Sequence, residues 1–310
     1  MRKILLTAIL SASVCMAQAQ QEIRLYEGEA PGSEGIQDNE RVNRGPDGNI
    51  QTISGVVTPS ITVFLPEAGK ATGTAVILCS GGGLMSHSWG SDVLNMAAWL
   101  NERGIAAIGL KYRTRVMGPS AGGGSPRMGG APGFGGGMAL SAEVYEFDKL
   151  TKSNANPDTS DSGQKNIDNA VADGLRAMEI VREHASEWHI DVKKIGFLGF
   201  SAGGGVALGA VVRADSNHMP AFIATIYGPS LIDVAVPENA PKLFIACRGN
   251  HHNVAAGLMS LYLDWKRAGK NAEMHLYDDG TGPFGPDDTG NTCGTWRESF
   301  YRWLQFNRMD

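Results

Sequence analysis

Continuous apolar runs alternate along the chain with amphipathic helical patterns, and this alternation predicts an α/β fold. We expect strands at 61–66, 73–79, 105–110, 195–200, 221–227, 242–247 and 272–277. Apolar residues at helical spacing predict helices at 88–103, 167–187, 206–212, 254–265 and 296–304. Because strand–helix–strand series are joined by right-handed crossovers, the sequence predicts one mostly parallel sheet flanked by helices on both faces.

The segment from Lys194 to Gly205 combines a buried strand, a sharp turn and the start of a helix. Within it, Ser201 stands between Gly199 and Gly203 in the spacing G-x-S-x-G, whose glycines allow a strained turn that lifts the serine hydroxyl above the strand ends. The bare spacing arises easily by chance in a chain with 41 glycines. The strand before it and the apolar helix after it favour a nucleophile elbow, with Ser201 as the candidate nucleophile.

A glycine-rich loop at 80–84 follows the predicted strand 73–79. Glycines at the end of a buried strand let backbone N–H groups approach a ligand closely, and in α/β-hydrolases a loop at this place supplies an oxyanion donor. The alternative is an ordinary turn between a strand and a helix. The elbow later in the chain favours the first interpretation.

Length and composition indicate a single domain over residues 20–310, because no Pro-rich or Ser-rich linker divides the chain of 310 residues. The net charge of −5 gives no basis for binding nucleic acid or an anionic membrane. No apolar run beyond the N-terminal segment is long enough to span a bilayer. Cys79, Cys247 and Cys293 cannot all pair, so buried thiols are favoured over a disulfide framework.

Residues 1–19 have the pattern of a secretory signal peptide. Two basic residues precede an apolar stretch, and Ala17 and Ala19 form an A-x-A cleavage site. A lipoprotein signal at Cys15 is the weaker alternative, because Val14 is not the small residue that such a signal needs before its cysteine. We therefore expect cleavage after Ala19 and a periplasmic or secreted protein.

A low-complexity segment at 118–137 is dominated by glycine, with a few prolines and methionines. This composition does not form a packed core, so we expect an insertion in the domain. The segment leaves the carboxyl end of a strand, on the side where active sites form in open α/β sheets. A lid, a substrate-contacting loop and a plain insertion all remain open.

With these elements placed, the chain resembles the acetylxylan-esterase-like and feruloyl-esterase-like α/β-hydrolases of bacterial carbohydrate degradation. The resemblance covers residues 56–306. It rests on the segments 61–66, 80–83, 104–107, 111–113, 176–178, 188–191 and 199–204, together with Asp173. It implies the α/β-hydrolase fold and hydrolysis of carboxylic esters.

The resemblance also implies a Ser-His-Asp triad, in which serine attacks an ester carbonyl, histidine carries the proton and an acid orients the histidine. Carried over to this chain, Ser201 is the nucleophile. The backbone N–H groups of Ala202 and of Gly82 or Gly83 then form the oxyanion hole.

Two of the three triad positions depart from the family pattern. The acid is expected directly after the strand 242–247, where residues 248–254 of this chain contain no carboxylate. The histidine is expected in a loop after the last strand, where Gly282 occupies its position. No histidine follows His275, so a base for Ser201 must come from elsewhere.

Three of the seven histidines are placed to reach Ser201. His251 and His252 occupy the loop of the missing acid and are candidate relocated bases, although loop histidines are more often only exposed. A metal site at this pair is disfavoured because no supporting ligand set accompanies it. His87, just beyond the glycine loop, is a candidate for substrate contact, and Asp233 is a candidate displaced acid.

Two functions follow from these features. The first is an exported serine hydrolase that needs no cofactor or metal and cleaves acyl esters, such as acetyl groups on polysaccharides, with Ser201 and a non-standard base. The second is a degraded α/β-hydrolase that binds a glycan or acyl ligand without efficient turnover. Without a triad member, the oxyanion hole and substrate binding still leave about 10³–10⁴-fold catalysis over water.

Overall fold

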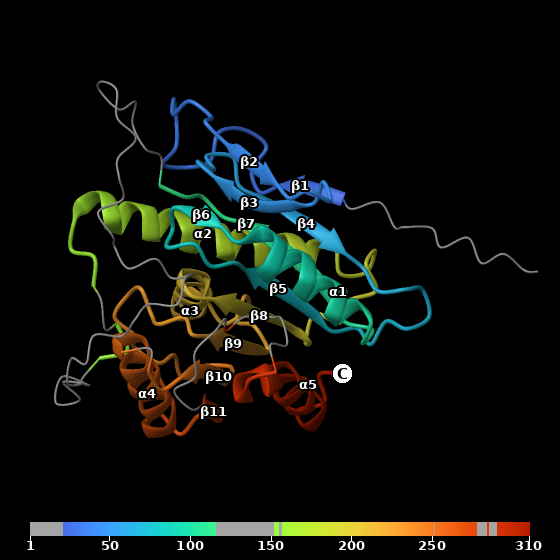
Figure 1. Cartoon of the computed structure of the whole chain (residues 1–310), viewed down its shortest axis with the longest axis vertical. Coiled ribbons are helices and arrows are strands. Elements are labelled where there is room, and N and C mark those ends of the chain that lie inside the picture. Colours follow the sequence, from blue (N-terminus) through green and yellow to red (C-terminus); the bar gives the residue numbers. More distant parts are fainter. Residues whose placement is uncertain (1–20, 116–151, 155–156, 251, 278–283, 285–289) are drawn as a thin grey trace, which may run out of the picture.

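A computed structural model describes residues 21–115, 152–154, 157–250, 252–277, 284 and 290–310. The expected signal peptide at 1–19 and the glycine-rich insertion at 118–137 lie outside these residues, as do His251 and Gly282. The described residues form one large sheet covered by helices on both faces, with a smaller sheet packed at one end (Figure 1).

The large sheet has eight strands, and most of them are parallel. In spatial order these are β1 (Gln21–Arg24), β4 (Ser60–Phe64), β7 (Ala106–Lys111), β5 (Ala75–Cys79), β8 (Ile195–Phe200), β9 (Phe222–Ile226), β10 (Lys242–Arg248) and β11 (Ala272–Tyr277). The first three strands pair antiparallel, and the pairs from β7 to β11 are parallel. The strands expected from the apolar runs are therefore confirmed, and the carboxyl ends of the six parallel strands from β7 to β11 share one edge of the sheet.

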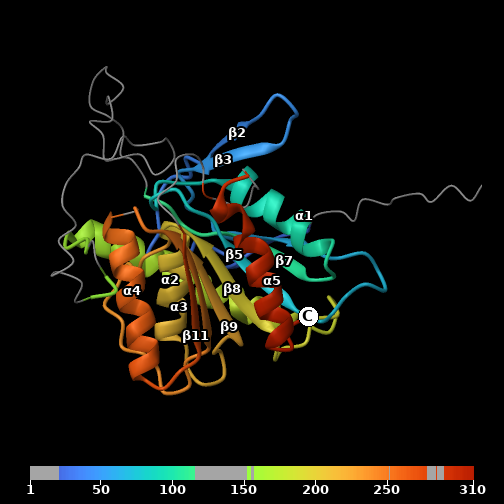
Figure 2. The same cartoon turned by 60° about the horizontal axis from the view of Figure 1, so that its bottom comes forward.

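Helices cover the two faces in separate sets, which Figure 2 shows on opposite sides of the strands. One face packs against α2 (Asp161–Glu183), α3 (Ala202–Arg213) and α4 (His252–Arg267), and the other against η1 (Trp89–Asn95), α1 (Met96–Asn101) and α5 (Trp296–Phe306). Because side chains alternate along a strand, Ile195 and Phe197 of β8 join the first core and Leu198 and Phe200 join the second. Burial on both faces explains the continuous apolar runs.

The predicted helix at 88–103 is continuous in the structure but changes type, and its regular part ends at Asn101. A π-helical turn, η1, precedes the α-helix α1, and a 3₁₀ turn, η3 (Thr292–Thr295), similarly precedes α5. Cys79, Cys247 and Cys293 are free and buried, which confirms the expectation for these three residues. Among the described helices, none combines the length and the apolar character needed to cross a membrane.

A small antiparallel sheet lies beside the carboxyl edge of the large one and was not expected in this form. It consists of β2 (Arg41–Arg44), β3 (Ile50–Ser54) and the two-residue strand β6 (Ser86–His87). Its hairpin β2–β3 projects from the body of the domain (Figures 1 and 2). Because β6 directly follows the glycine loop at 80–84, pairing of Ile53 with His87 ties this hairpin to the loop.

Candidate functional site

Ser201 lies in a strained turn between β8 and α3. Its backbone has φ 49° and ψ −127°, a conformation that side chains with a Cβ rarely adopt. The two glycines of the motif make the turn sterically accessible. A Cβ on Gly203 would lie 2.1 Å from the carbonyl oxygen of Cys79, and one on Gly199 would lie 2.4 Å from that of Gly203. The elbow geometry expected from the spacing is therefore present, with Ser201 only 7% exposed.

The glycine loop lies next to Ser201 and leaves backbone donors without partners. Gly82 has φ 135°, and a Cβ there would lie 1.9 Å from the carbonyl oxygen of Ser86, so a side chain at this position would displace the loop. Within the described part of the chain, the N–H groups of Gly82, Gly83 and Ala202 have no hydrogen-bond acceptor. These are the groups expected to form the oxyanion hole, and they remain available to a substrate oxygen.

A buried carboxylate, which the sequence did not indicate, lies close to Ser201. Asp92 of η1 is 3% exposed, and its Oδ2 accepts the N–H of Gly81 at 2.8 Å. A Cβ added to Gly81 would lie 3.1 Å from the Cβ of Ser201 and 3.3 Å from Oδ2 of Asp92. The signal for this residue in the sequence is weak: one acid in the helical pattern that follows the glycine loop.

His87 is a core residue, and its buried ring offers no exposed surface for the substrate contact expected of it. It is fully buried, with Nδ1 2.8 Å from Oγ of Ser80 and Nε2 2.8 Å from the carbonyl oxygen of Tyr112. Only a protonated Nε2 can donate to a carbonyl, so Nδ1 accepts from Ser80. Burial lowers the pKa of His87 to about 4. The ring is therefore neutral and holds the base of the glycine loop.

Tyr112 completes this buried network, which fixes the start of the glycine loop. Its hydroxyl donates to the carbonyl oxygen of Ser80 at 2.7 Å, and its ring lies edge-on to that of His87, with centroids 4.4 Å apart. Ser80, His87 and Tyr112 thus form a closed set of hydrogen bonds beneath the loop, and all three are buried. Such a satisfied polar network makes the loop position unique.

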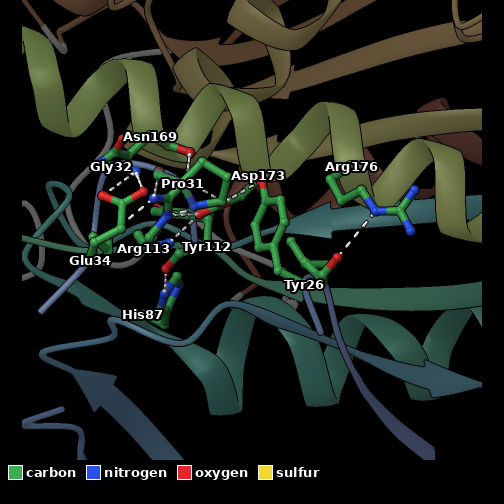
Figure 3. Close-up of polar contacts among 12 residues, drawn as sticks. Tyr26, Pro31, Gly32, Glu34, His87, Tyr112, Arg113, Asn169, Asp173 and Arg176 are labelled. Carbon is green, nitrogen blue, oxygen red and sulfur yellow. Dashed lines mark hydrogen bonds and ion pairs between the residues drawn. The ribbon is translucent and has the colours of Figure 1, made fainter. Parts of the chain in front are cut away.

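A second buried network, shown in Figure 3, anchors the segment that follows β7. Arg113 binds Asp173 of α2 through Nη2 at 2.8 Å and Nε at 2.9 Å, and its backbone N–H donates to the same carboxylate at 2.9 Å. The guanidinium also donates to the carbonyl oxygens of Pro31 and Asn169. Arg113 therefore joins the N-terminal segment, β7 and α2 at the edge of the sheet that carries the site.

Arg248 stands at the end of β10, where the resemblance places the triad acid. Its Nη2 donates to Sγ of Cys293 at 3.4 Å, and its guanidinium lies 5.6 Å from the ring of Phe284. The absence of a carboxylate from the described residues 248–250 leaves this position without its acid. His251, the side chain of His252 and the loop around Gly282 lie outside the described residues, so their roles stay predictions.

Three other described histidines bind neighbouring acids, and His189 lies exposed in the turn before β8, at the opposite edge of the sheet from Ser201. His184 contacts Glu187, His218 contacts Asp215 and His275 contacts Glu273, at 2.8, 2.6 and 2.8 Å. The side chain of Asp233 is 75% exposed and lies 3.9 Å from Nζ of Lys152, so the structure gives this candidate acid an exposed partner rather than a histidine. Among the described residues, no three metal-binding side chains come together.

Comparison with known proteins gives the same fold as the strand order of the large sheet. Residues 159–278 match a family described as having the alpha/beta hydrolase fold. No curated protein sequence matches the chain significantly.

Several solved structures are similar in fold. An acetyl ester-xyloside bifunctional hydrolase from Caldicellulosiruptor lactoaceticus is 17% identical with a TM-score of 0.60, over 93% of this chain and 97% of that protein. The carboxylesterase Cest-2923 from Lactobacillus plantarum is 15% identical with a TM-score of 0.57, over 88% and 98%. Esterase 2 from Thermogutta terrifontis, phosphoramylated by tabun, is 17% identical with a TM-score of 0.55, over 91% and 96%. With its eight-stranded sheet and matching segment, this chain is an α/β-hydrolase-fold protein.

Proposed function

We propose that the chain is an exported serine hydrolase that cleaves acyl esters, with acetyl groups on polysaccharides as the substrate class. The observation that carries this proposal is the strained Ser201, next to N–H groups of Gly82, Gly83 and Ala202 that have no acceptor among the described residues. Strain of this kind persists where surrounding structure enforces it, and it clusters at active sites. The signal peptide pattern at 1–19 supports a periplasmic or secreted location.

The geometry fits a two-step acyl transfer. Oγ of Ser201 would attack the ester carbonyl while a base takes its proton, and the resulting oxyanion would accept hydrogen bonds from Ala202 and from Gly82 or Gly83. Collapse of this intermediate expels the alcohol, which receives the proton from the base. Water then attacks the acyl-serine ester and releases the carboxylic acid and free Ser201.

His251 or His252 is the proposed base. Among the histidines with described side chains, His87 is buried in its network, and His184, His218 and His275 bind their own acids. His189 precedes β8 and lies at the opposite edge of the sheet from Ser201. The loop after β10 leaves the same sheet edge as the elbow, because β8, β9 and β10 are adjacent and parallel. A base from this loop therefore approaches Ser201 from the side opposite the glycine loop.

The polysaccharide part of the proposal rests on resemblance. The similar structures include an acetyl ester-xyloside hydrolase and a carboxylesterase, and both fall in a range of identity where only the fold is shared. Acetylated xylan is therefore the first polymer to test, with small acetyl esters as the general probe.

A second candidate function is binding of a glycan or acyl ligand without turnover. The observation in its favour is Arg248, which stands where the acid of a triad is expected. A site with an oxyanion hole and no activated serine binds ester-like ligands and turns them over slowly.

Reaction with a fluorophosphonate probe separates the two functions. The proposed hydrolase is labelled, loses the label in Ser201→Ala and releases acetate from acetylated xylan or p-nitrophenyl acetate. Replacing His251 and His252 singly by Asn then identifies the base, with the exposed His218→Asn as the control. A folded wild-type protein that neither reacts with the probe nor releases acetate would contradict the hydrolase and favour the binding protein.

A further inference from the structure

Tyr227 adopts the same unusual backbone region as Ser201 and lies directly beside it. Ser201 follows β8 and Tyr227 follows β9, and the last paired residues of these strands are Phe200 and Ile226. Their φ angles are 49° and 42°. A bulky aromatic residue at positive φ is a backbone outlier, and strain of this kind clusters at functional sites.

Tight packing between the two turns holds Tyr227 in this conformation. Its N–H donates to the carbonyl oxygen of Ala246 at 2.8 Å, which fixes it to β10. A Cβ on the next residue, Gly228, would lie 2.5 Å from the carbonyl oxygen of Ser201 and 2.7 Å from the Cα of Gly204. The turn at Tyr227 therefore rests against the elbow itself, and the position of each depends on the other.

The side chain of Tyr227 is half-buried among aromatic rings. Its centroid lies 6.2 Å from that of Phe200 and 5.4 Å from that of Phe284. Burial, and then the negative charge of Asp92, hold the pKa of Tyr227 well above its ordinary value. The phenol therefore keeps its proton near neutral pH, so it can donate a hydrogen bond but cannot serve as a base.

The order of strands places Ser201 between two kinds of donor. The glycine loop follows β5 on one side of β8, and Tyr227 follows β9 on the other. An ester whose carbonyl oxygen accepts from the glycine loop directs its alkoxy oxygen toward the opposite side. Among the described residues, Tyr227 follows the strand next to β8 on that side, and the proposed base comes from the loop after the next strand, β10.

We propose that Tyr227 is a further catalytic residue, whose hydroxyl donates a hydrogen bond to the alkoxy oxygen of the ester as the bond to the acyl carbon breaks. This inference rests on the proposed function. The Tyr227 proton stays on its own oxygen throughout. The proton that completes the departing alcohol is the one that the base took from Ser201, so the step balances without a further reactant.

The test is the dependence of turnover on the leaving group. Tyr227→Phe keeps the ring between Phe200 and Phe284 and removes only the hydroxyl. We expect kcat/KM for ethyl acetate, whose alkoxide is a poor leaving group, to fall about tenfold or more, the value of one hydrogen bond of roughly 1.4 kcal/mol. For p-nitrophenyl acetate, whose phenolate leaves without help, kcat/KM should change less than about threefold, since little charge needs a donor. The ratio kcat/KM is the measure because both esters form the same acetyl-serine, whose hydrolysis enters kcat alike.

Tyr301→Phe is the matched control, because Tyr301 of α5 packs edge-on to Trp99, with centroids 6.2 Å apart, away from the elbow. It should leave both rates unchanged. Thermal unfolding checks that each variant folds, and if Tyr227→Phe does not fold, Tyr227→Leu must show the same dependence on the ester. If Tyr227→Phe lowers the rates for the two esters equally, the role of Tyr227 is overturned and the proposed function is not. A wild-type protein inactive on both overturns the proposed function and this inference with it.

Discussion

Oδ2 of Asp92 accepts the backbone N–H of Gly81 at 2.8 Å, in direct contact with the turn that carries Ser201. This hydrogen bond uses the first donor of the glycine loop. The donors of Gly82 and Gly83 remain for a ligand. Asp92 therefore fixes the position of the glycine loop by binding the backbone N–H of Gly81.

Replacing Asp92 should free the glycine loop from its fixed position beside Ser201. In Asp92→Ala the N–H of Gly81 loses its acceptor, and we expect the rate of fluorophosphonate labelling of Ser201 to fall about tenfold, the value of one hydrogen bond. Asp92→Asn keeps an acceptor oxygen and should retain most of the rate. Labelling that drops equally in the two variants would show that the negative charge, and not the hydrogen bond, supports the site.

His87 should make the protein sensitive to acid. Its pKa is lowered to about 4 in the folded state from an ordinary value of 6.5, so the unfolded chain binds more protons between these pH values. Stability from this residue is complete above pH 6.5 and is lost as pH falls toward 4, by roughly 3 kcal/mol in all. Urea unfolding at a series of pH values measures the slope.

Glutamine at position 87 removes the titration while keeping a polar side chain. His87→Gln should lower stability at pH 7, because the Ser80 and Tyr112 contacts are disturbed, and should flatten the slope between pH 6.5 and 4. The exposed His184→Gln is the control and should leave the slope as it is in the wild type. An unchanged slope in His87→Gln would mean that this histidine does not carry the acid sensitivity.

Local patterns in the sequence predict most of the fold, because its determinants are local. A parallel strand covered on both faces must be apolar throughout, so runs such as 73–79 and 195–200 are visible without any partner. The elbow is also local, since Gly199 and Gly203 act on the turn that contains Ser201. The position of each element then follows from connections between consecutive strands.

Contacts between distant segments are the part that the sequence does not reveal. Pairing of β3 with β6 buries His87, and nothing in the residues around His87 distinguishes a buried neutral ring from one that faces a ligand. Asp92 lies in the π-helical turn η1. Because a π-helix has a different number of residues per turn from an α-helix, the direction of the Asp92 side chain toward Gly81 does not follow from an apolar pattern that predicts one α-helix. Tyr227 follows an ordinary strand, and its strain comes from packing against the elbow.

Removing one partner of the buried Arg113–Asp173 pair should destabilise the fold strongly. Both side chains are almost fully buried, at 3% and 0% exposure, so Arg113→Met leaves an uncompensated buried carboxylate and should cost about 3–5 kcal/mol of unfolding free energy. Arg213→Met, which breaks an exposed pair with Asp168, should cost less than about 1 kcal/mol. Denaturant unfolding compares the two, and equal losses would contradict a buried role for Arg113.

The backbone strain at Ser201 should reverse the usual order of stability, in which an alanine variant is more stable than a glycine variant. Ser201→Ala and Ser201→Gly both remove the hydroxyl, and neither should react with a fluorophosphonate. At φ 49° a Cβ is unfavourable, so the glycine variant should be more stable than the alanine variant by about 1–2 kcal/mol. Ala98→Gly in α1 is the control, because at an exposed helical position glycine should instead lower stability by about 1 kcal/mol. If alanine proves the more stable residue at both positions, the elbow does not store strain, and activation of Ser201 must come entirely from its polar neighbours.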